Sequence, residues 1–399
     1  MDMAKPIIRF KGYQDDWEQR KLGDLTEELS EYATMASGLP LLTSSRSGLM
    51  YQSDFRDRKT TTSDETLFSI VPKGSCTYRH MSDDDIFHLN INVLEKGLVS
   101  REYPVFISSE NNDLEFIIQH INSSDRFRAF CKGQKKGGTR TRLYYKTLCE
   151  FEMMIPSIEE QKKISATLHS LDYLITLHQR KCDETKRLKK YMLQKMFPQN
   201  GEKVPEIRFS GFTDDWEQRK LSELLVERNV QHSQSEEFPL VSFTVENGVT
   251  PKTERYEREQ LVRGDKSAKK YKETRLDDIV YNPANLKFGA ISRNKLGNAV
   301  FSPIYVTFEV KKDLVKPSFI EMVVTRKNFI QKALQYQQGT VYERMAVNTE
   351  DFTNLDVYIP NGFEQEKIGN YFENLDHLIT LHQQKCFYNI YTFNQTKKL

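Results

Sequence analysis

The residues best suited to chemistry in this sequence are basic side chains in a glycine-containing stretch. Between residues 126 and 149 there are eight Lys or Arg residues and no Asp or Glu. The centre of the stretch, residues 133–142, carries Lys135, Lys136, Arg140 and Arg142. Glycine lets backbone N–H groups approach phosphate, Lys and Arg neutralise it, and Arg can read guanine in the major groove. The stretch predicts a DNA-binding loop; a solvated charged surface is the alternative.

A second basic group lies in the other half of the chain. It spans Arg263–Arg275, with Lys266, Lys269, Lys270 and Lys272, and is followed by Lys287, Arg293 and Lys295. The formal net charge of the whole chain is only +2, which by itself gives weak support for nucleic-acid binding. Two basic groups nevertheless favour DNA binding more than either group alone.

Catalytic patterns are incomplete. Asn282-Pro-Ala-Asn285 is close to the Asn-Pro-Pro-aromatic motif of adenine methyltransferases, but Asn285 has no ring to stack on a flipped base. No Gly-rich cofactor loop follows a predicted strand. The Asp83-Asp84-Asp85 run lacks the Glu-x-Lys partner of a metal-dependent nuclease. We therefore predict a non-catalytic chain. A stand-alone DNA methyltransferase is one alternative. A DNA-binding regulator is another, although no helix-turn-helix pattern is found.

Two His–Cys pairs have the spacing of metal ligands on a helix. His178 with Cys182 and His382 with Cys386 are each four residues apart, so together they could form a Cys₂His₂ zinc site. The simpler interpretation is that all four side chains fill a helix seam. The five cysteines include no CxxC pair and are expected to be reduced thiols. We expect no bound metal.

The chain repeats itself, and the repeat supplies the elements that position the basic groups. Residues 8–22 recur as 207–221, with Trp17 and Trp216 at the same place, and residues 171–182 recur as 375–386. A repeat of roughly 200 residues is too long for a solenoid. The regions between the motifs, about 26–154 and 225–358, share almost no sequence. Similar frames around different inserts indicate one scaffold with two specificities.

The second motif of each repeat predicts a long helix. Over residues 159–197, apolar or small residues recur in steps of four and three, which is the period of a coiled-coil seam. The first seam comprises Ile164, Leu168, Leu171, Ile175, His178, Cys182, Met192 and Met196; the second comprises Ile368, Phe372, Leu375, Ile379, His382 and Cys386. Pairing the two stripes buries both, and the internal symmetry favours an antiparallel pair.

The divergent regions are predicted to be α+β. Helical stretches are expected near 112–131 and 317–336. Expected strands are Thr66–Val71, Val105–Ser108, Phe151–Ile155, Leu240–Val245, Asp278–Tyr281, Ala299–Val310 and Leu355–Ile359. The expected organisation is two recognition domains, 1–156 and 199–360, and two spacer helices, 157–198 and 361–399. The sequence is 38% hydrophobic and 29% charged. It has no run of about 18 apolar residues and no secretory signal at its start, so we expect a cytoplasmic protein.

The doubled motifs resemble those of type I restriction–modification DNA-specificity subunits. The resemblance is carried by Arg-Phe-x-Gly-Tyr/Phe…Trp-Glu…Lys-Leu, by Ile-Pro…Glu-Gln-x-Lys-Ile, by Leu-Asp-x-Leu-Ile, and by the linker at residues 193–198. It implies two target recognition domains that each read half of a split DNA site. It also implies that the paired helices set the distance between the two half-sites and dock two methyltransferase subunits. The full complex is then expected to contain restriction subunits as well. S-adenosylmethionine, ATP and Mg are then expected in the partner subunits and no cofactor in this chain.

The resemblance also assigns residues. Residues 278–292 are similar to a recurring recognition-domain segment, and residues 70–79 are assigned as their counterpart in the first domain. Besides the basic residues named above, the implied DNA-facing positions are Lys73, Tyr78, Arg79, Thr139, Thr340 and Arg344. The implied docking positions are Leu171, Leu174, Ile175, Leu375, Leu378 and Ile379. The second helix departs from the first after Cys386, where nothing corresponds to residues 191–197.

Overall fold

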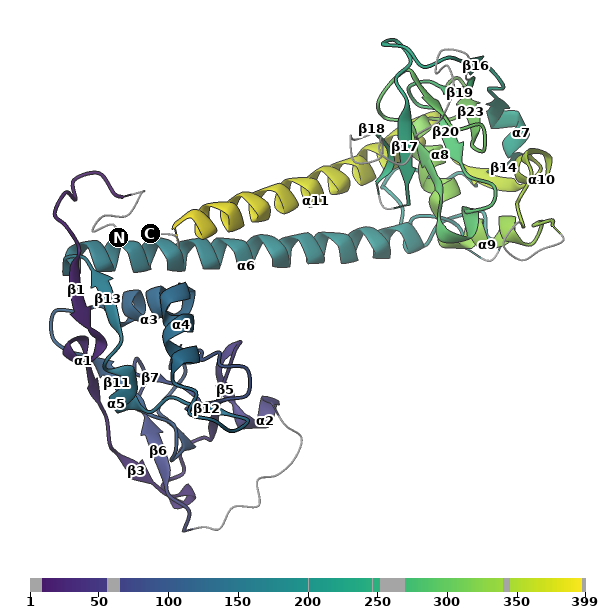
Figure 1. The fold of residues 1–399 in the computed structure, drawn as a ribbon. Helices are drawn as coiled ribbons and strands as arrows, with labels where there is room; N and C mark the ends of the chain where they lie inside the picture. The colour runs from purple at the N-terminus through teal and green to yellow at the C-terminus, as the bar shows by residue number, and fades with distance from the viewer. Residues whose placement is uncertain are drawn as a thin grey trace. The chain divides into compact units, whose positions relative to one another are not determined.

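The computed structural model of the protein describes residues 9–55, 65–199, 201–245, 247–251, 270–339 and 345–396. The chain divides into two units, Met1–His178 with Gln384–Leu399, and Gln179–Gln383. Each unit contains one α+β domain and part of each of two long helices (Figure 1). The division between units therefore falls inside the helices.

The first unit contains a mixture of short strands and helices. Its strands are β1 (Glu18–Lys21), β2 (Thr26–Glu28), β3 (Tyr32–Ala33), β4 (Leu42–Ser45), β5 (Gly48–Tyr51), β6 (Phe68–Val71), β7 (Cys76–Thr77), β8 (Met81–Ser82), β9 (Asn90–Ile91), β10 (Gly97–Ser100), β11 (Val105–Ser108), β12 (Thr141–Arg142) and β13 (Glu152–Ile155). Its helices are α1 (Leu22–Leu25), α2 (Gln52–Phe55), α3 (Leu114–Ser123), α4 (Asp125–Gly133), α5 (Tyr145–Leu148) and the start of α6 (Ile158–Lys195).

The second unit has a corresponding series of elements. Its strands are β14 (Glu217–Lys220), β15 (Leu225–Glu227), β16 (Gln231–His232), β17 (Val241–Thr244), β18 (Gly248–Pro251), β19 (Tyr271–Thr274), β20 (Ile279–Tyr281), β21 (Ile291–Arg293), β22 (Ala299–Phe301), β23 (Val306–Val310) and β24 (Asp356–Ile359). Its helices are α7 (Leu221–Leu224), α8 (Pro317–Thr325), α9 (Lys327–Leu334), α10 (Thr349–Thr353) and the start of α11 (Gly362–Thr396).

The two divergent regions have the same sheet topology. A four-stranded sheet has the order β2-β11-β7-β9 in the first domain and β15-β23-β20-β21 in the second. A three-stranded sheet has the order β10-β6-β3 in the first and its equivalent β22-β19-β16 in the second. Asn92 and Asn294 occupy equivalent buried turns, where each side-chain amide donates to backbone carbonyls before and after it in sequence. The α+β prediction is confirmed, and it extends to a shared topology that the sequences do not reveal.

Two expected elements are interrupted at corresponding places. The helix expected near 112–131 is divided into α3 and α4 at Ser124, whose extended backbone lets its hydroxyl accept from Phe127 N–H at 3.2 Å. The helix expected near 317–336 is divided into α8 and α9 at Arg326, which is also extended. The single strand expected over 299–310 is two strands, β22 and β23, separated by a turn that includes Pro303. Helical periodicity continues through a one-residue break, so the sequence pattern could not detect these breaks.

Each domain is fixed to its long helix by a buried arginine–carboxylate pair. Arg9 donates to both oxygens of Glu160 at 2.7 Å, and Arg208 donates to both oxygens of Glu364 at 2.7 Å. The side chains of Glu160 and Glu364 are 1% and 0% exposed. Each glutamate is followed by a buried glutamine, Gln161 or Gln365, whose amide donates to the carbonyl of the proline before the helix at 2.8 Å. The first motif of each repeat is therefore bonded to the start of the long helix that follows it.

The two long helices run antiparallel. In the second unit, Lys189 near the end of α6 forms an ion pair with Asp376 in the first half of α11 at 2.5 Å. In the first unit, Phe393 near the end of α11 packs against the core that contains Ile164 and Leu168 from the start of α6. These contacts confirm the antiparallel pairing. They also show that the outer seam residues are buried in the domain cores.

The buried pair in the second unit predicts the effect of removing one charge. Glu364→Gln leaves the Arg208 guanidinium buried without its counter-charge, so we expect the free energy of unfolding to fall by about 3 kcal/mol. Urea unfolding followed by the fluorescence of Trp216 measures this change. Glu184→Gln is the matched control, because the pair between Glu184 and Arg180 is exposed on α6 and contributes little. Equal midpoints for the two variants would contradict the prediction.

Candidate nucleic-acid interface

The basic loop, residues 133–142, connects α4 to β12 in the first domain. Its end is fixed because β12 pairs with β8, with Thr141 opposite Ser82 and Arg142 opposite Met81. Gly137 and Gly138 have positive φ values of 78° and 82°, a conformation that other residues rarely adopt. The loop is thus shaped by its glycines and presents its cations from a defined strand end.

Three consecutive aspartates, which we call the acidic turn (Asp83–Asp85), lie beside the basic loop. Arg140 Nε is 2.7 Å from Asp83 Oδ1, and Lys135 Nζ is 3.6 Å from Asp85 Oδ1. In the structure all three carboxylates are paired with cations, since Asp84 is bonded to Arg46.

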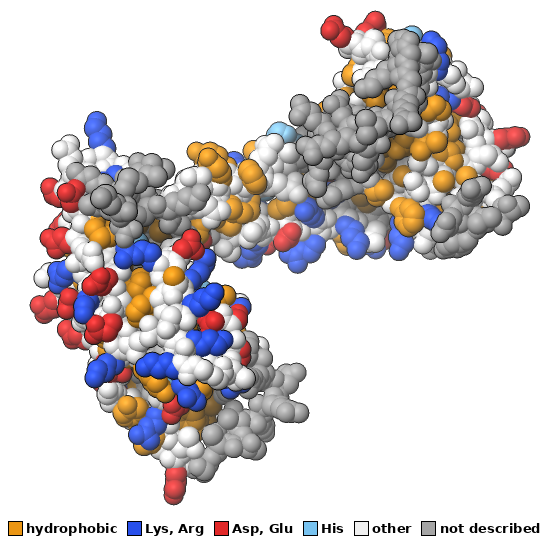
Figure 2. Space-filling model, in the orientation of Figure 1, with side chains coloured by type: hydrophobic (Ala, Val, Ile, Leu, Met, Phe, Trp, Pro, Cys, Tyr) orange, Lys and Arg blue, Asp and Glu red, His pale blue; other side chains and the backbone are white. Residues whose placement is uncertain are grey.

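Three other cations of this surface are unpaired among the described residues. Arg79, Lys136 and Arg142 are exposed, and none of them forms an ion pair with a residue that the structure describes. Figure 2 shows Lys and Arg side chains gathered over α4 and the β12 region of this domain, while acidic side chains gather over β1 and α1. The expected DNA-facing positions Lys73 and Thr139 are also exposed.

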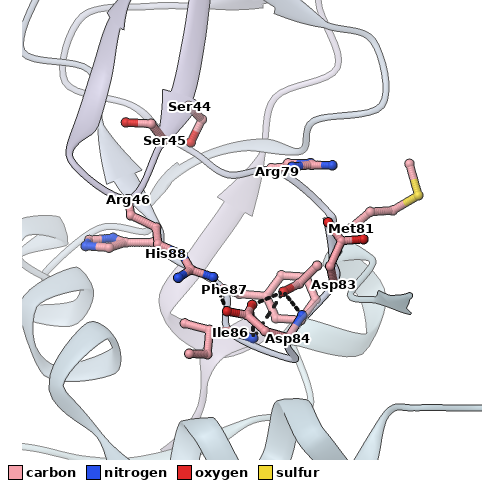
Figure 3. A pocket seen from close by; sticks show the side chains of 11 residues that line it. Ser44, Ser45, Arg46, Arg79, Met81, Asp83, Asp84, Ile86, Phe87 and His88 are labelled. Atoms are coloured by element: carbon pink, nitrogen blue, oxygen red, sulfur yellow. Dashed lines mark hydrogen bonds and ion pairs between the residues drawn. The ribbon is translucent and has the colours of Figure 1, made fainter. Parts of the chain in front are cut away.

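A polar hollow of about 270 Å³ opens between the β4–β5 hairpin and the segment that carries Arg79 and the acidic turn (Figure 3). Its lining includes Ser44, Ser45, Arg46, Arg79, Asp83, Asp84 and His88. Hydrogen bonds from Arg46 and Ser82 lower the pKa of Asp84, so its carboxylate is ionised at neutral pH. The sequence analysis missed Arg46 and His88, because they lie outside the basic stretch and become neighbours only through folding.

Tyr78 is a core residue and is not available to DNA, which corrects its assignment as a contact. Its side chain is fully buried and donates to the carbonyl of Leu143 at 3.0 Å, and burial raises the pKa of its hydroxyl. Tyr281 in the second domain is likewise buried and donates to the carbonyl of Val347 at 3.1 Å. The two tyrosines are therefore equivalent structural residues.

This equivalence also corrects the correspondence assigned between residues 70–79 and 278–292. The sheet orders place β7 opposite β20 and β6 opposite β19. The counterpart of Asp278–Tyr281 is thus the segment 75–78. Ile70 and Val71 correspond instead to the end of β19, and residues 72–74 to the turn that follows it.

In the second domain the expected DNA-facing residues have different environments. Arg293 is only 12% exposed and is bound by Asp277, Glu321 and Glu373, so it connects the domain to α11 and is not free for DNA. Lys270 is exposed, and Lys287 is half-buried with its amine 5.1 Å from the centroid of the Phe288 ring. Lys269, Thr340 and Arg344 lie outside the described residues.

The expected docking residues differ in accessibility. Leu174 and Leu378 are exposed, and Leu171, Ile175 and Ile379 are half-buried. Leu375 is buried in the core of the second unit, which corrects its assignment as a docking residue. The most exposed apolar residues near the end of α11 were not identified from sequence; they are Phe387, Tyr388 and Tyr391. Figure 2 shows hydrophobic side chains gathered over the last turns of α11.

The described residues hold little that suits a cofactor. No group of three or more His, Cys, Asp or Glu residues in the described part of the chain is placed to hold a metal ion, which includes the two His–Cys pairs. Asn282 is buried, and its side-chain oxygen accepts from the backbone N–H groups of Ala284 and Asn285. Asn282 therefore caps its own turn, and the alternative of a stand-alone methyltransferase has no support. No described helix is long and apolar enough to cross a membrane.

Comparisons with known proteins agree with this arrangement. Residues 86–187, which include the basic loop and the first part of α6, match the family model of the type I restriction modification DNA specificity domain. The crystal structure of the S subunit of a type I restriction-modification system from M. genitalium has the same fold, with a TM-score of 0.57 over 100% of this chain and 98% of that chain at 12% identity. Residues 86–187 are therefore similar to that specificity domain, and the whole chain shares the fold of a solved S subunit.

A second solved structure matches this chain with a lower TM-score. The HsdS subunit from Thermoanaerobacter tengcongensis gives a TM-score of 0.43 at 14% identity, covering 92% of this chain and 91% of that chain. No curated protein matches the chain.

The environments of Tyr78 and Arg79 predict opposite effects of two neighbouring substitutions in the first domain. Tyr78→Phe removes a buried hydrogen bond and should lower the free energy of unfolding by about 1–2 kcal/mol without changing DNA affinity. Arg79→Ala should weaken DNA binding and leave stability unchanged. Urea unfolding and DNA titration of both variants measure these effects. Equal losses of DNA affinity would show that Tyr78 contacts DNA after all.

Proposed function

We propose that each α+β domain of this specificity subunit reads one half of a split DNA target. The observation that carries this proposal is the duplication of one scaffold with two different surfaces. The two domains share sheet orders and helix junctions, yet their described surfaces differ: the first has a basic loop and a polar hollow, and the second exposes Lys270 and Phe288. A common frame with different surfaces suits two independent recognition tasks.

Within the first domain, the contacts divide by chemistry. Lys136 lies in the glycine-shaped loop, where an ammonium group neutralises phosphate without reading sequence. Arg79 at the hollow and Arg142 on β12 are held on defined backbone, so a guanidinium there can make two parallel hydrogen bonds to guanine. Losing Lys136 should therefore weaken binding to all sequences, whereas losing Arg79 or Arg142 should relax one position of one half-site.

The long helices set the distance between half-sites and dock methyltransferase subunits. A 38-residue helix such as α6 spans about 57 Å at 1.5 Å per residue, so it can act as a fixed spacer. We propose two methyltransferase subunits and, in the full complex, restriction subunits. The chain itself supplies recognition, and S-adenosylmethionine, ATP and Mg act in the partner subunits.

Mapping of methylated sites tests this division of labour. Replacing residues 26–154 with the same region of a relative should change one half-site only. Inserting seven residues in α6, at a point between Ile164 and Met196, adds about two turns to the helix. The insertion should lengthen the distance between the half-sites and leave the sequence of both half-sites unchanged. A domain swap that altered both half-sites would contradict the proposal. So would an insertion that altered base identity but not spacing.

Exposed aromatic side chains on α11 predict the position of a docking contact. Phe387 and Tyr391 are 73% and 58% exposed, and large exposed aromatic groups commonly mark protein interfaces. The double variant Phe387→Ala, Tyr391→Ala should lower the affinity for the methyltransferase subunit at least tenfold, measured by calorimetry with purified subunits. Phe288→Ala removes a similarly exposed ring from the second domain and is the control. Unchanged affinity in the double variant would exclude this end of α11 from docking.

A further inference from the structure

The acidic turn lies between two basic surfaces of the first domain and binds cations from both. Asp84 is bonded to Arg46 at the mouth of the polar hollow. Asp83 and Asp85 are bonded to Arg140 and Lys135 of the basic loop. The aspartates and their partners are separated by 38 to 57 residues in sequence, so these contacts depend on the tertiary fold. The three carboxylates of this turn thus pair with three cations of the domain.

The turn has a fixed conformation. Ser82 donates to Asp84 Oδ1 at 2.9 Å, and its hydroxyl accepts from the N–H of Ile86 at 3.1 Å. Asp85 has a φ of 62°, and its carboxylate is bonded to the hydroxyl of Thr141. The adjacent strand β8 pairs with β12, which carries Thr141 and ends the basic loop. In the DNA-free chain the carboxylates are therefore held in place beside the loop.

The pairs themselves are easily exchanged. Arg140 and Asp83 are 53% and 63% exposed, and Lys135 is 41% exposed. Exposed ion pairs of this kind contribute little to stability, so an arriving phosphate can replace a carboxylate without unfolding the domain. Until that exchange occurs, the three carboxylates occupy their partner cations and so reduce the number of cations that are free to bind phosphate.

We propose that the acidic turn is an intramolecular competitor for DNA phosphate that suppresses binding to non-target DNA. This inference rests on the proposed function of the first domain as a DNA reader. On any duplex, Lys136, Arg142 and Arg79 are available at once. Lys135, Arg140 and Arg46 become available only when the bound DNA displaces the carboxylates. Favourable base contacts at a correct half-site supply the free energy for this displacement, and a random sequence does not.

The competing interpretation is that the aspartates contact DNA directly. Asp can accept a hydrogen bond from the amino group of cytosine in the major groove. In that case the carboxylates contribute to target binding, and their removal weakens it. The two interpretations therefore predict opposite signs for the effect of Asp→Asn substitution on affinity.

The test uses the full chain with Asp83→Asn and Asp85→Asn as separate variants. Asn tolerates the positive φ at position 85. Asp125→Asn is the matched control, because Asp125 is an exposed aspartate in the same domain that pairs with Arg128 and not with the basic loop. The probe is a random-sequence DNA duplex, and its affinity is measured by fluorescence anisotropy over a range of salt concentrations.

We expect Asp83→Asn and Asp85→Asn to bind the random duplex about three- to tenfold more tightly than wild type. The slope of log affinity against log salt should steepen by about one unit for each released cation. Asp125→Asn should behave as wild type. In the Arg140→Ala background, Asp83→Asn should give no gain, because the cation that it releases is absent.

The inference is overturned if Asp83→Asn and Asp85→Asn match the control, if they weaken binding, or if the gain persists without Arg140. The proposed function stands in each of these cases if the wild-type chain binds the duplex and Lys136→Ala reduces the salt dependence of that binding. A wild-type chain without any salt-dependent DNA binding refutes the proposed function itself, and the competitor role with it.

Discussion

The structure depends on one interaction made twice, the buried pairing of an arginine from the first motif with a glutamate at the start of a long helix. Arg9 with Glu160 and Arg208 with Glu364 bring together segments more than 150 residues apart in sequence. Each pair closes a domain whose interior sequence is free to vary. Because a bidentate pair has a defined geometry, it also fixes the direction in which each helix leaves its domain. The orientation of each domain relative to the long helix that leaves it is thus set by the repeated motifs.

Conserved hydrogen bonds inside the domains explain how different sequences keep one topology. The amides of Asn92 and Asn294 hold equivalent turns, and Tyr78 and Tyr281 hold equivalent carbonyls. The surfaces outside this skeleton differ in chemistry. The first domain has paired and unpaired charges beside a polar hollow, and the second exposes Phe288 beside a half-buried Lys287. Recognition can therefore diverge without changing the fold.

The sequence alone predicted what was repeated and periodic. The duplicated motifs gave the two domains and the antiparallel helices, and charge clustering located the basic loop. It failed where the outcome depends on tertiary partners. The burial of Tyr78 and the binding of Arg293 by Glu373, 80 residues away, leave no local pattern. The hollow beside Arg46 was missed for the same reason. The matching of residues 70–79 with 278–292 failed because short strands carry too little sequence signal to set their register.

The central claim is that the repeated motifs and helices can carry either divergent region, and that each region recognises its half-site independently of the other. A chain in which residues 26–151 also replace residues 225–355 tests it directly, since Leu22 N–H binds the carbonyl of Phe151 as Leu221 N–H binds that of Leu355, at 2.8 and 3.0 Å. The measurement is the methylated sequence in cells that supply the partner subunits. The account predicts a symmetric target, with the first half-site repeated in inverted orientation at unchanged spacing. A target that kept the original second half-site, or an altered first half-site, would contradict it.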